Sequence, residues 1–191
     1  MGSPKAWLPF GHERMLQRVA RLAAMAAEPI VVVAAPDQPL PDLPSDVSIA
    51  RDPIEGRGPL QGLAAGLAAM PDQVELVYAT STDVPFLLPE WIDWMAQVIG
   101  PHAIAIPQVG GYWHPLAAIY RAAEARPVVS RLLAEDRLRP VFLMESLSCR
   151  VVTEVELRAI DPDLRTLWNL NTPEDYALAL RAAGLANGST P

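Results

Sequence analysis

A buried apolar run ends at a single carboxylate in the stretch 74–88, which reads Val-Glu-Leu-Val-Tyr-Ala-Thr-Ser-Thr-Asp-Val-Pro-Phe-Leu-Leu. A buried parallel strand is typically a continuous apolar run, and in open α/β sheets ligands gather beyond the carboxyl ends of the strands. Asp83 is therefore a candidate carboxylate for a metal or phosphate site. The alternative is an ordinary turn aspartate ahead of Pro85, because Asp often makes local backbone hydrogen bonds in such loops.

A glycine-rich segment from Asp52 to Gly62, Asp-Pro-Ile-Glu-Gly-Arg-Gly-Pro-Leu-Gln-Gly, lies between an expected short strand and an expected helix. Gly56 and Gly58 let the backbone approach a ligand, and the free N–H groups at a helix start favour anions. Pro59 suits the first helical turn, since its missing N–H has no partner there. Alternatively, the glycines only permit a tight turn and close helix packing, and Asp52 is a surface acid.

Three further residue types bear on chemistry. Lys5 could hold a phosphate as a point charge, although a lysine near a terminus is usually solvated. The histidines His12, His102 and His114 show no spacing typical of a zinc site. Cys149, the only cysteine, is best interpreted as a small buried residue of a strand. No Gly-x-Ser-x-Gly sequence indicates a serine hydrolase.

The composition predicts one globular domain. The chain has 191 residues, of which 51% are hydrophobic and 19% charged, enough for a substantial core. Its net charge of −7, without a long Lys/Arg run, argues against nucleic acid or an anionic membrane as a partner. With no membrane-spanning stretch and no targeting segment, a cytoplasmic location is expected. We expect a single domain over 1–186 and a mobile tail over 187–191.

Hydrophobic periodicity indicates how the elements position these residues. It predicts helices over 13–27, 59–70, 89–99, 122–134, 141–147 and 173–183, and strands over 29–35, 47–50, 74–83, 103–107, 112–120, 149–152 and 167–170. Thr172 is the expected N-cap of the last helix, with Pro173 in its first turn. Strands that alternate with helices indicate an α/β fold, a mostly parallel sheet covered on both faces.

Five motifs, taken in order, resemble the molybdenum cofactor guanylyltransferase family of the nucleotidyltransferase superfamily. They are Met1-Gly-x-Pro-Lys5, Asp52 with Gly56-Arg-Gly-Pro-Leu-Gln-Gly62, Thr82-Asp-Val-Pro-Phe-Leu87, His114-Pro-Leu-Ala-Ala-Ile-Tyr120 and Asn169-Leu-Asn-Thr-Pro-Glu-Asp175. Together they span nearly the whole chain. The resemblance implies a three-layer, Rossmann-like domain with a mostly parallel mixed sheet. It also implies an enzyme that uses Mg²⁺ to transfer GMP from GTP to molybdopterin, releasing pyrophosphate.

The same resemblance assigns roles to residues. Lys5 would contact the nucleotide phosphates, Asp83 would hold magnesium, and Asp52 would help to bind the guanine nucleotide beside the glycine-rich segment with Gly56, Gly58, Pro59 and Gly62. Such a reaction needs positioned phosphates and neutralised charge, without a protein nucleophile. His114 and Asn171 match family motifs on the acceptor side and at the closing helix. For Asn171, a purely structural role ahead of its helix is the alternative.

Two departures from the family pattern affect these expectations. The family begins with a strand that leads into a Leu-Ala-Gly-Gly loop and a Ser/Arg segment, and none of these precedes Met1 here. We therefore expect the first strand to be missing from the sheet, with a poor phosphate site and an unpaired edge. This difference from the family has three candidate explanations: an upstream initiation codon, a shortened version of the protein, or a natural truncation that has lost catalysis. The first is favoured. Our hypothesis is that the chain as given is weak or inactive and that a longer form transfers nucleotides.

The second departure concerns the nucleotide base. The strand 31–35 ends in Ala35, where the guanylyltransferases tend to carry asparagine. A cytidylyltransferase-like relative that uses another nucleoside triphosphate thus stays open, as does a sugar-phosphate nucleotidyltransferase with another phosphate acceptor. A non-catalytic nucleotide-binding relative is the rival from a different class. No feature of the sequence predicts an oligomeric state.

Overall fold

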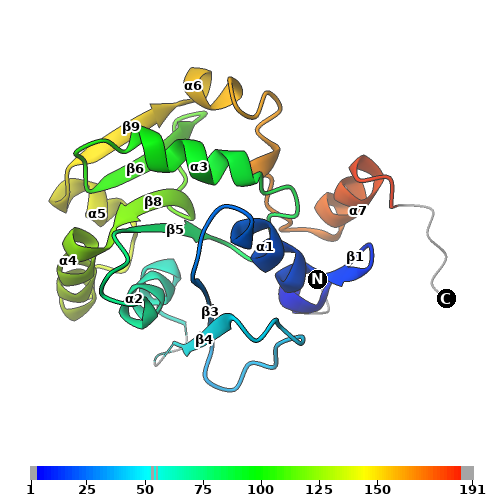
Figure 1. Cartoon of the computed structure of the whole chain (residues 1–191), viewed down its shortest axis with the longest axis horizontal. Helices are drawn as coiled ribbons and strands as arrows, with labels where there is room; N and C mark the ends of the chain where they lie inside the picture. The colour runs from blue at the N-terminus through cyan, green and yellow to red at the C-terminus, as the bar shows by residue number, and fades with distance from the viewer. Residues whose placement is uncertain (1–3, 53, 55, 186–191) are drawn as a thin grey trace.

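The fold is known from a computed structural model that describes residues 4–52, 54 and 56–185 (Figure 1). Its α-helices are α1 (Met15–Ala24), α2 (Pro59–Ala69), α3 (Pro89–Val98), α4 (Ala122–Ala134), α5 (Val141–Ser146), α6 (Glu154–Arg158) and α7 (Pro173–Ala182). Its strands are β1 (Pro9–Phe10), β2 (Glu13–Arg14), β3 (Ile30–Ala34), β4 (Val47–Arg51), β5 (Leu76–Thr80), β6 (Ile104–Val109), β7 (Tyr112–Trp113), β8 (Ala117–Arg121) and β9 (Cys149–Thr153). Short 3₁₀ helices, η1 and η2, occupy Lys5–Trp7 and Arg165–Leu167.

The main sheet has five strands and mixed direction. Strand β6 pairs in parallel with β9 and antiparallel with β7 and β8, and β8 pairs antiparallel with β5. Strands β5, β6 and β9 consequently run in one direction, and only β7 and β8 are reversed. This confirms a mostly parallel mixed sheet.

The expected sheet is divided in two. Strands β3 and β4 form a separate parallel pair, and within the described ranges no ladder joins β3 to β5. Among the residues that the structure describes, β3 and β5 therefore each have one edge without a ladder partner. The unpaired edge that the sequence predicts is present, and it occurs in the middle of the fold.

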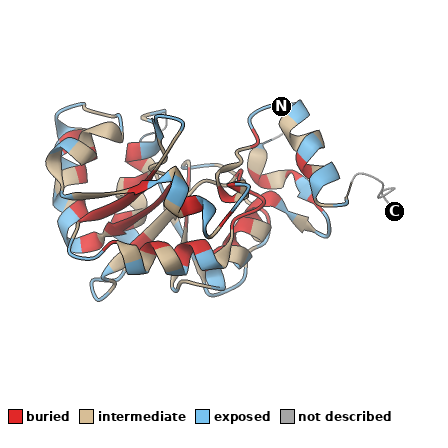
Figure 2. Cartoon of the chain, turned by 90° about the horizontal axis from the view of Figure 1, so that it is seen from above, coloured by how far each residue is buried: buried red, intermediate tan, exposed pale blue. Residues whose placement is uncertain are grey.

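Side-chain alternation along the strands builds the three layers. In β6, the buried Ile104 and Ile106 belong to a core with α2, α4 and α5, while Ala105 between them belongs to a core with α1 and α3. Successive side chains point to opposite faces of a strand, so both faces of the sheet are apolar and covered. Figure 2 shows this as buried strands enclosed between helices that are exposed on their outer sides.

Helix starts follow the predicted chemistry. Gly58 caps α2 with a φ of +78°, and Pro59 fills the first turn. At α7, the Thr172 hydroxyl accepts a hydrogen bond from the Asp175 backbone N–H, and the Asp175 carboxylate accepts one from the Thr172 N–H, so the predicted N-cap is confirmed. None of the described helices is long and apolar enough to cross a membrane.

Several element predictions are wrong. The expected strand 112–120 is two strands, β7 and β8, separated by His114-Pro115-Leu116, because proline cannot donate to a ladder. The segment 167–170 is not a strand: η2 ends at Leu167, and the next residues lie against an apolar cluster that includes Phe86 and Leu170. The short β1–β2 hairpin and α6 were not predicted. The expected tail 187–191 lies outside the described residues.

Candidate active site

Lys5, Asp83 and Asn171 meet at the carboxyl end of β5. The Lys5 Nζ donates to Asp83 Oδ2 at 2.5 Å and to Asn171 Oδ1 at 2.9 Å. Lys5 opens η1, Asp83 follows β5 by three residues, and Asn171 lies just before α7. The fold thus joins residues separated by 78 and 166 positions in the chain.

The Asp83 carboxylate is buried and held from two further directions. Its Oδ1 accepts hydrogen bonds from Ser81 Oγ at 2.6 Å and from Asn169 Nδ2 at 2.9 Å. Burial, the largest single influence, raises the pKa of Asp83, but the hydrogen bonds from Lys5, Ser81 and Asn169 together hold this pKa below its ordinary value. Asp83 is therefore an oriented carboxylate at neutral pH and not an isolated turn aspartate.

The N-terminus of α7 positions Asn171. The Asn171 backbone N–H donates to Asp175 Oδ2 at 3.1 Å, and the Leu170 N–H donates to the Asp83 carbonyl oxygen at 3.0 Å. These bonds tie the segment ahead of α7 to the loop after β5. The structural role that the sequence left open for Asn171 and a contact with Lys5 are thus both present.

Lys5 is the only lysine of the chain, whose other basic residues are arginines and three histidines. A lysine ammonium is a compact point charge, whereas an arginine guanidinium is a planar fork. Its side chain is 38% exposed, so the ammonium that contacts the buried Asp83 also faces solvent. A cation in this position can contact an anionic ligand while keeping its acidic partner.

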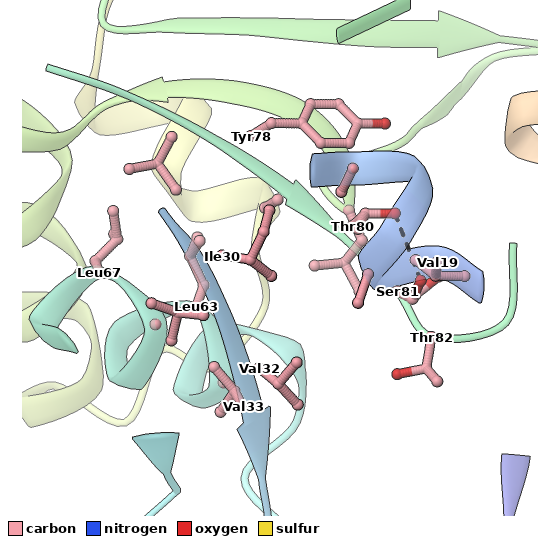
Figure 3. Close-up of a pocket in the computed structure, with 18 of the residues that line it drawn as sticks. Val19, Ile30, Val32, Val33, Leu63, Leu67, Tyr78, Thr80, Ser81 and Thr82 are labelled. Carbon is pink, nitrogen blue, oxygen red and sulfur yellow. Dashed lines mark hydrogen bonds between the residues drawn. The ribbon is translucent and has the colours of Figure 1, made fainter. Parts of the chain in front are cut away.

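The glycine-rich segment borders a cavity of about 550 Å³ between β3 and β5 (Figure 3). Its lining includes the predicted residues Asp52, Gly56, Gly58, Pro59 and Gly62, together with Thr80, Ser81 and Thr82. The cavity thus extends from the glycine-rich segment to the residues just before Asp83. Ser81 links the two regions, since it lines the cavity and donates to Asp83.

The backbone geometry gives different reasons for the individual glycines of the segment. Gly56 has a φ of +82°, a region that L side chains rarely adopt, and its turn requires glycine, as does that of Gly58. At Gly62, nothing lies within 4 Å of the position of an added Cβ, so close helix packing does not account for it. Asp52 Oδ1 accepts a hydrogen bond from the Ile54 N–H at 3.0 Å.

His114 lies apart from this cluster, in the turn between β7 and β8. Its backbone N–H donates to the Pro107 carbonyl oxygen, and burial lowers the pKa of the imidazole. No side-chain hydrogen bond joins His114 to Lys5, Asp83 or Asn171 in the part of the chain that the structure describes. Leu116, two residues later, lines the cavity.

Three polar residues of the site were not selected from the sequence. Ser81 and Asn169 bind Asp83, and Asn169 stands two residues before Asn171 in the same motif, a spacing that places both in one extended segment. Gln38 lines the cavity beyond β3 and accepts a hydrogen bond from the Ala35 N–H through Oε1 at 3.2 Å. Gln38 lies three residues after Ala35, the position that the sequence analysis singled out for the nucleotide base. The loop around Gln38 has no hydrophobic periodicity, so no pattern in the sequence pointed to this residue.

The oxygen donors of the site suit a hard divalent cation. Among residues 4–52, 54 and 56–185, no group of three or more Asp, Glu, His or Cys side chains could hold an ion. Mg²⁺ is commonly bound by one or two carboxylates plus substrate phosphates and water. Asp83 Oδ2 and Asn171 Oδ1, both within hydrogen-bonding distance of the Lys5 ammonium, are hard oxygen atoms already facing a cation. These residues fit Mg²⁺ bound together with a phosphate ligand.

Comparison with known proteins bears on the same region. The family described as "MobA-like NTP transferase domain" matches residues 1–149. The molybdenum cofactor guanylyltransferase of Desulfosudis oleivorans is 31% identical over 179 residues, covering 93% of this chain and 86% of the relative. A probable molybdenum cofactor guanylyltransferase of Mycobacterium tuberculosis is 32% identical over 176 residues, covering 90% and 83%.

Solved structures share the fold. The Archaeoglobus fulgidus molybdopterin-guanine dinucleotide biosynthesis protein A superposes with a TM-score of 0.78 at 18% identity, over 96% of this chain and 92% of the other. The Thermus thermophilus 2-C-methyl-D-erythritol 4-phosphate cytidylyltransferase gives 0.70 at 18% identity, over 96% and 95%. These likenesses establish a Rossmann-like nucleotidyltransferase fold.

Proposed function

The chain belongs to the MobA-like NTP transferase family, and from this membership we propose that it transfers GMP from GTP to molybdopterin in molybdenum cofactor biosynthesis. Two curated relatives at 31% and 32% identity carry that guanylyltransferase name over most of their length. The observation that carries the proposal is the cluster of Lys5, Asp83 and Asn171 beside a cavity bordered by the glycine-rich segment.

The reaction replaces one phosphoanhydride bond by another. An oxygen of the acceptor's phosphate forms a bond to the α-phosphorus of the nucleotide, and the bond from that phosphorus to the pyrophosphate oxygen breaks. The chain's own contribution is to position and neutralise charge. Lys5 supplies a positive charge to the phosphates, Asn171 and Asp83 hold its ammonium in place, and the Asp52–Gly62 segment receives the nucleoside.

We propose Mg²⁺ as the cofactor, held by Asp83 and phosphate oxygens. When bound, the ion adds charge neutralisation around the phosphates. Ser81 and Asn169 keep the carboxylate oriented, since each donates to Asp83 Oδ1 and leaves Oδ2 turned toward Lys5. His114, set apart from the cluster, is assigned to the acceptor side.

The proposal is tested by pyrophosphate release from GTP in the presence of molybdopterin and Mg²⁺. Asp83→Asn should lower the rate by about 10²-fold, the usual cost of losing one group that stabilises charge in the transition state. Asp163→Asn removes an exposed carboxylate elsewhere and is the matched control. If Asp83→Asn turned over as fast as the unchanged chain, Asp83 would have no catalytic role.

The same assay separates the non-catalytic alternative. Binding of GTP without any release of pyrophosphate would favour a non-catalytic nucleotide-binding relative.

Cytidylyl transfer is the second candidate, favoured by one observation. The end of β3 presents Ala35 and Gln38 at the cavity, where the guanylyltransferases tend to carry asparagine. Parallel assays with GTP and CTP, each with molybdopterin and with a sugar phosphate as acceptor, separate the candidates. The pair that yields product identifies the base and the acceptor.

A further inference from the structure

Arg165 is the first residue of η2, in the segment that leads from α6 to α7. Its guanidinium carbon, Cζ, lies over the Phe86 ring, 4.0 Å from the ring centre. A guanidinium is attracted to the negative face of an aromatic ring. The contact therefore holds the guanidinium in place, but a phenyl ring provides no conventional hydrogen-bond acceptor for its N–H donors.

The N–H donors of Arg165 have no acceptor among the residues that the structure describes. Its side chain takes part in no hydrogen bond and no ion pair there, although the residue is half-buried. Neighbouring arginines are paired, Arg150 with Glu156 and Arg158 with Glu154. The donors of a guanidinium form a fork that matches the oxygens of a carboxylate or a phosphate. Arg165 is therefore suited to bind an anion from outside the chain.

The ring beneath Arg165 is itself fixed by packing. Phe86 is buried, and its ring centre lies 5.8 Å from that of Phe10 and 5.3 Å from that of Trp168. These residues belong to the apolar cluster that also contains Leu170. A guanidinium held on a packed ring loses less side-chain freedom when it binds a ligand, so Arg165 is pre-organised for its anion.

The two segments that form this contact also build the candidate active site. Phe86 follows Asp83 by three residues, and Arg165 precedes Asn169, which donates to Asp83 at 2.9 Å, by four. Four residues span at most about 14 Å between Cα atoms, so Arg165 borders the cluster around Asp83. Arg165 is not among the described residues that line the cavity beside the glycine-rich segment. Its position therefore favours the acceptor over the nucleoside as the source of the anion.

We propose that Arg165, held on Phe86, binds the phosphate monoester of the acceptor. Its fork holds two of the terminal oxygens and leaves another to form the bond to the α-phosphorus of the nucleotide. Its positive charge also offsets the repulsion between the two phosphates as they approach. The inference rests on the proposed function for the identity of the ligand, whereas phosphate binding by Arg165 is measurable without turnover.

NMR titrations of the full chain test the site directly. The side-chain Nε–H signal of Arg165, assigned by its loss in Arg165→Lys, reports on the guanidinium. Lys5 is the only lysine, so its side-chain signal reports separately on the phosphate site beside Asp83. We expect inorganic phosphate and molybdopterin each to shift the Arg165 signal, and chloride at equal ionic strength to leave it in place. GTP with Mg²⁺ should shift the Lys5 signal and leave that of Arg165 unchanged.

Kinetics of pyrophosphate release give the second readout. Arg165→Met should raise the KM for molybdopterin by at least about tenfold, the usual effect of losing hydrogen bonds to a charged group, and should leave the KM for GTP nearly unchanged. Arg165→Lys keeps a cation over the ring and should recover only part of the loss, because lysine lacks the fork. Arg181→Met removes an exposed arginine from α7 and is the matched control.

Three results would overturn the proposal: no shift of the Arg165 signal with phosphate and molybdopterin, equal KM values for molybdopterin in Arg165→Met and Arg181→Met, or a shift of the Arg165 signal with GTP as large as that with molybdopterin. The last result would make the nucleotide the source of the phosphate. If molybdopterin shifts the Arg165 signal but no pyrophosphate is released from GTP, the phosphate site is supported and the proposed reaction is refuted. The two failures are thus distinguishable.

Discussion

The Lys5 ammonium lies between two oxygen atoms, Asp83 Oδ2 and Asn171 Oδ1, and retains partial exposure to solvent. Every other permanently charged basic side chain in the sequence is an arginine. Arginine prefers bidentate contacts, and its planar fork is not equivalent to the compact ammonium that contacts both Asp83 and Asn171. Size as well as charge is therefore expected to matter at this position.

Lys5→Arg tests this requirement, with Lys5→Met as the variant that removes the charge. We expect Lys5→Met to weaken nucleoside triphosphate binding by at least about tenfold, because a positive charge is lost beside the phosphates, and Lys5→Arg to recover only part of it. Isothermal titration with GTP and Mg²⁺ measures both. Full recovery in Lys5→Arg would mean that charge alone suffices.

The sequence identified the carboxylate of the site but not its supports. Asp83 is visible because an apolar run leads into it, a local signal. Ser81 and Asn169 carry no such signal, since their importance lies in hydrogen bonds to Asp83, one of them across 86 positions of the chain. Contacts of that kind depend on where α7 and its preceding segment dock.

Two helices begin with reciprocal side-chain caps. In α7, Thr172 and Asp175 exchange hydrogen bonds, and in α6, Thr153 and Glu156 do the same. The cap of α7 was predictable from Thr172-Pro173, whereas α6, only five residues long, has too few turns to produce a periodic pattern. Caps matter here because the residues just before α7 contact Lys5 and Asp83.

Thr172→Ala should destabilise the protein by about 1 kcal/mol, the typical cost of losing an N-cap hydroxyl. Thr172→Ser keeps the hydroxyl and is the matched variant. Urea unfolding monitored by circular dichroism gives both values. A loss of the same size in Thr172→Ser would show that the methyl group, rather than the hydrogen bond, is responsible.

Glu156 makes stability depend on pH in acid. Hydrogen bonds from the Thr153 side chain and backbone, with the Arg150 ion pair, lower the pKa of Glu156 from 4.5 to about 2. A lowered pKa in the folded state gives a contribution that is complete above pH 4.5 and is lost as the pH falls toward 2. Glu156→Gln should therefore flatten the fall of the unfolding midpoint between these pH values. Parallel slopes for the two proteins would contradict the assignment.

The divided sheet gives the molecule regions of unequal stability. Strand β6 is paired on both sides, by β8 and β9, whereas β3 is paired only with β4 in the described part of the chain. A two-stranded sheet is marginal by itself, so β3 and β4 depend on their packing against α1 and α2. The edge of β3 that borders the cavity is therefore the weak side.

Hydrogen exchange should reveal this difference. The amides of β3 are expected to exchange at least about tenfold faster than those of β6, because opening of the β3–β4 pair does not require the main sheet to open. Exchange followed residue by residue by NMR gives the comparison. Equal protection of β3 and β6 would mean that the two sheets unfold as one unit.

Local chemistry was sufficient to predict most helices and strands, the cap at Thr172, the turn at Gly58-Pro59 and the candidate carboxylate Asp83. Each of these features depends on neighbours in the sequence. The folded chain alone decided the reversal of β8, the division of the sheet beside β3 and the joining of Lys5, Asp83 and Asn171. These features depend on which strands share an edge and which distant segments dock together. Hydrophobic periodicity indicates which face of a helix or strand is buried. It does not determine which distant segment packs against that face.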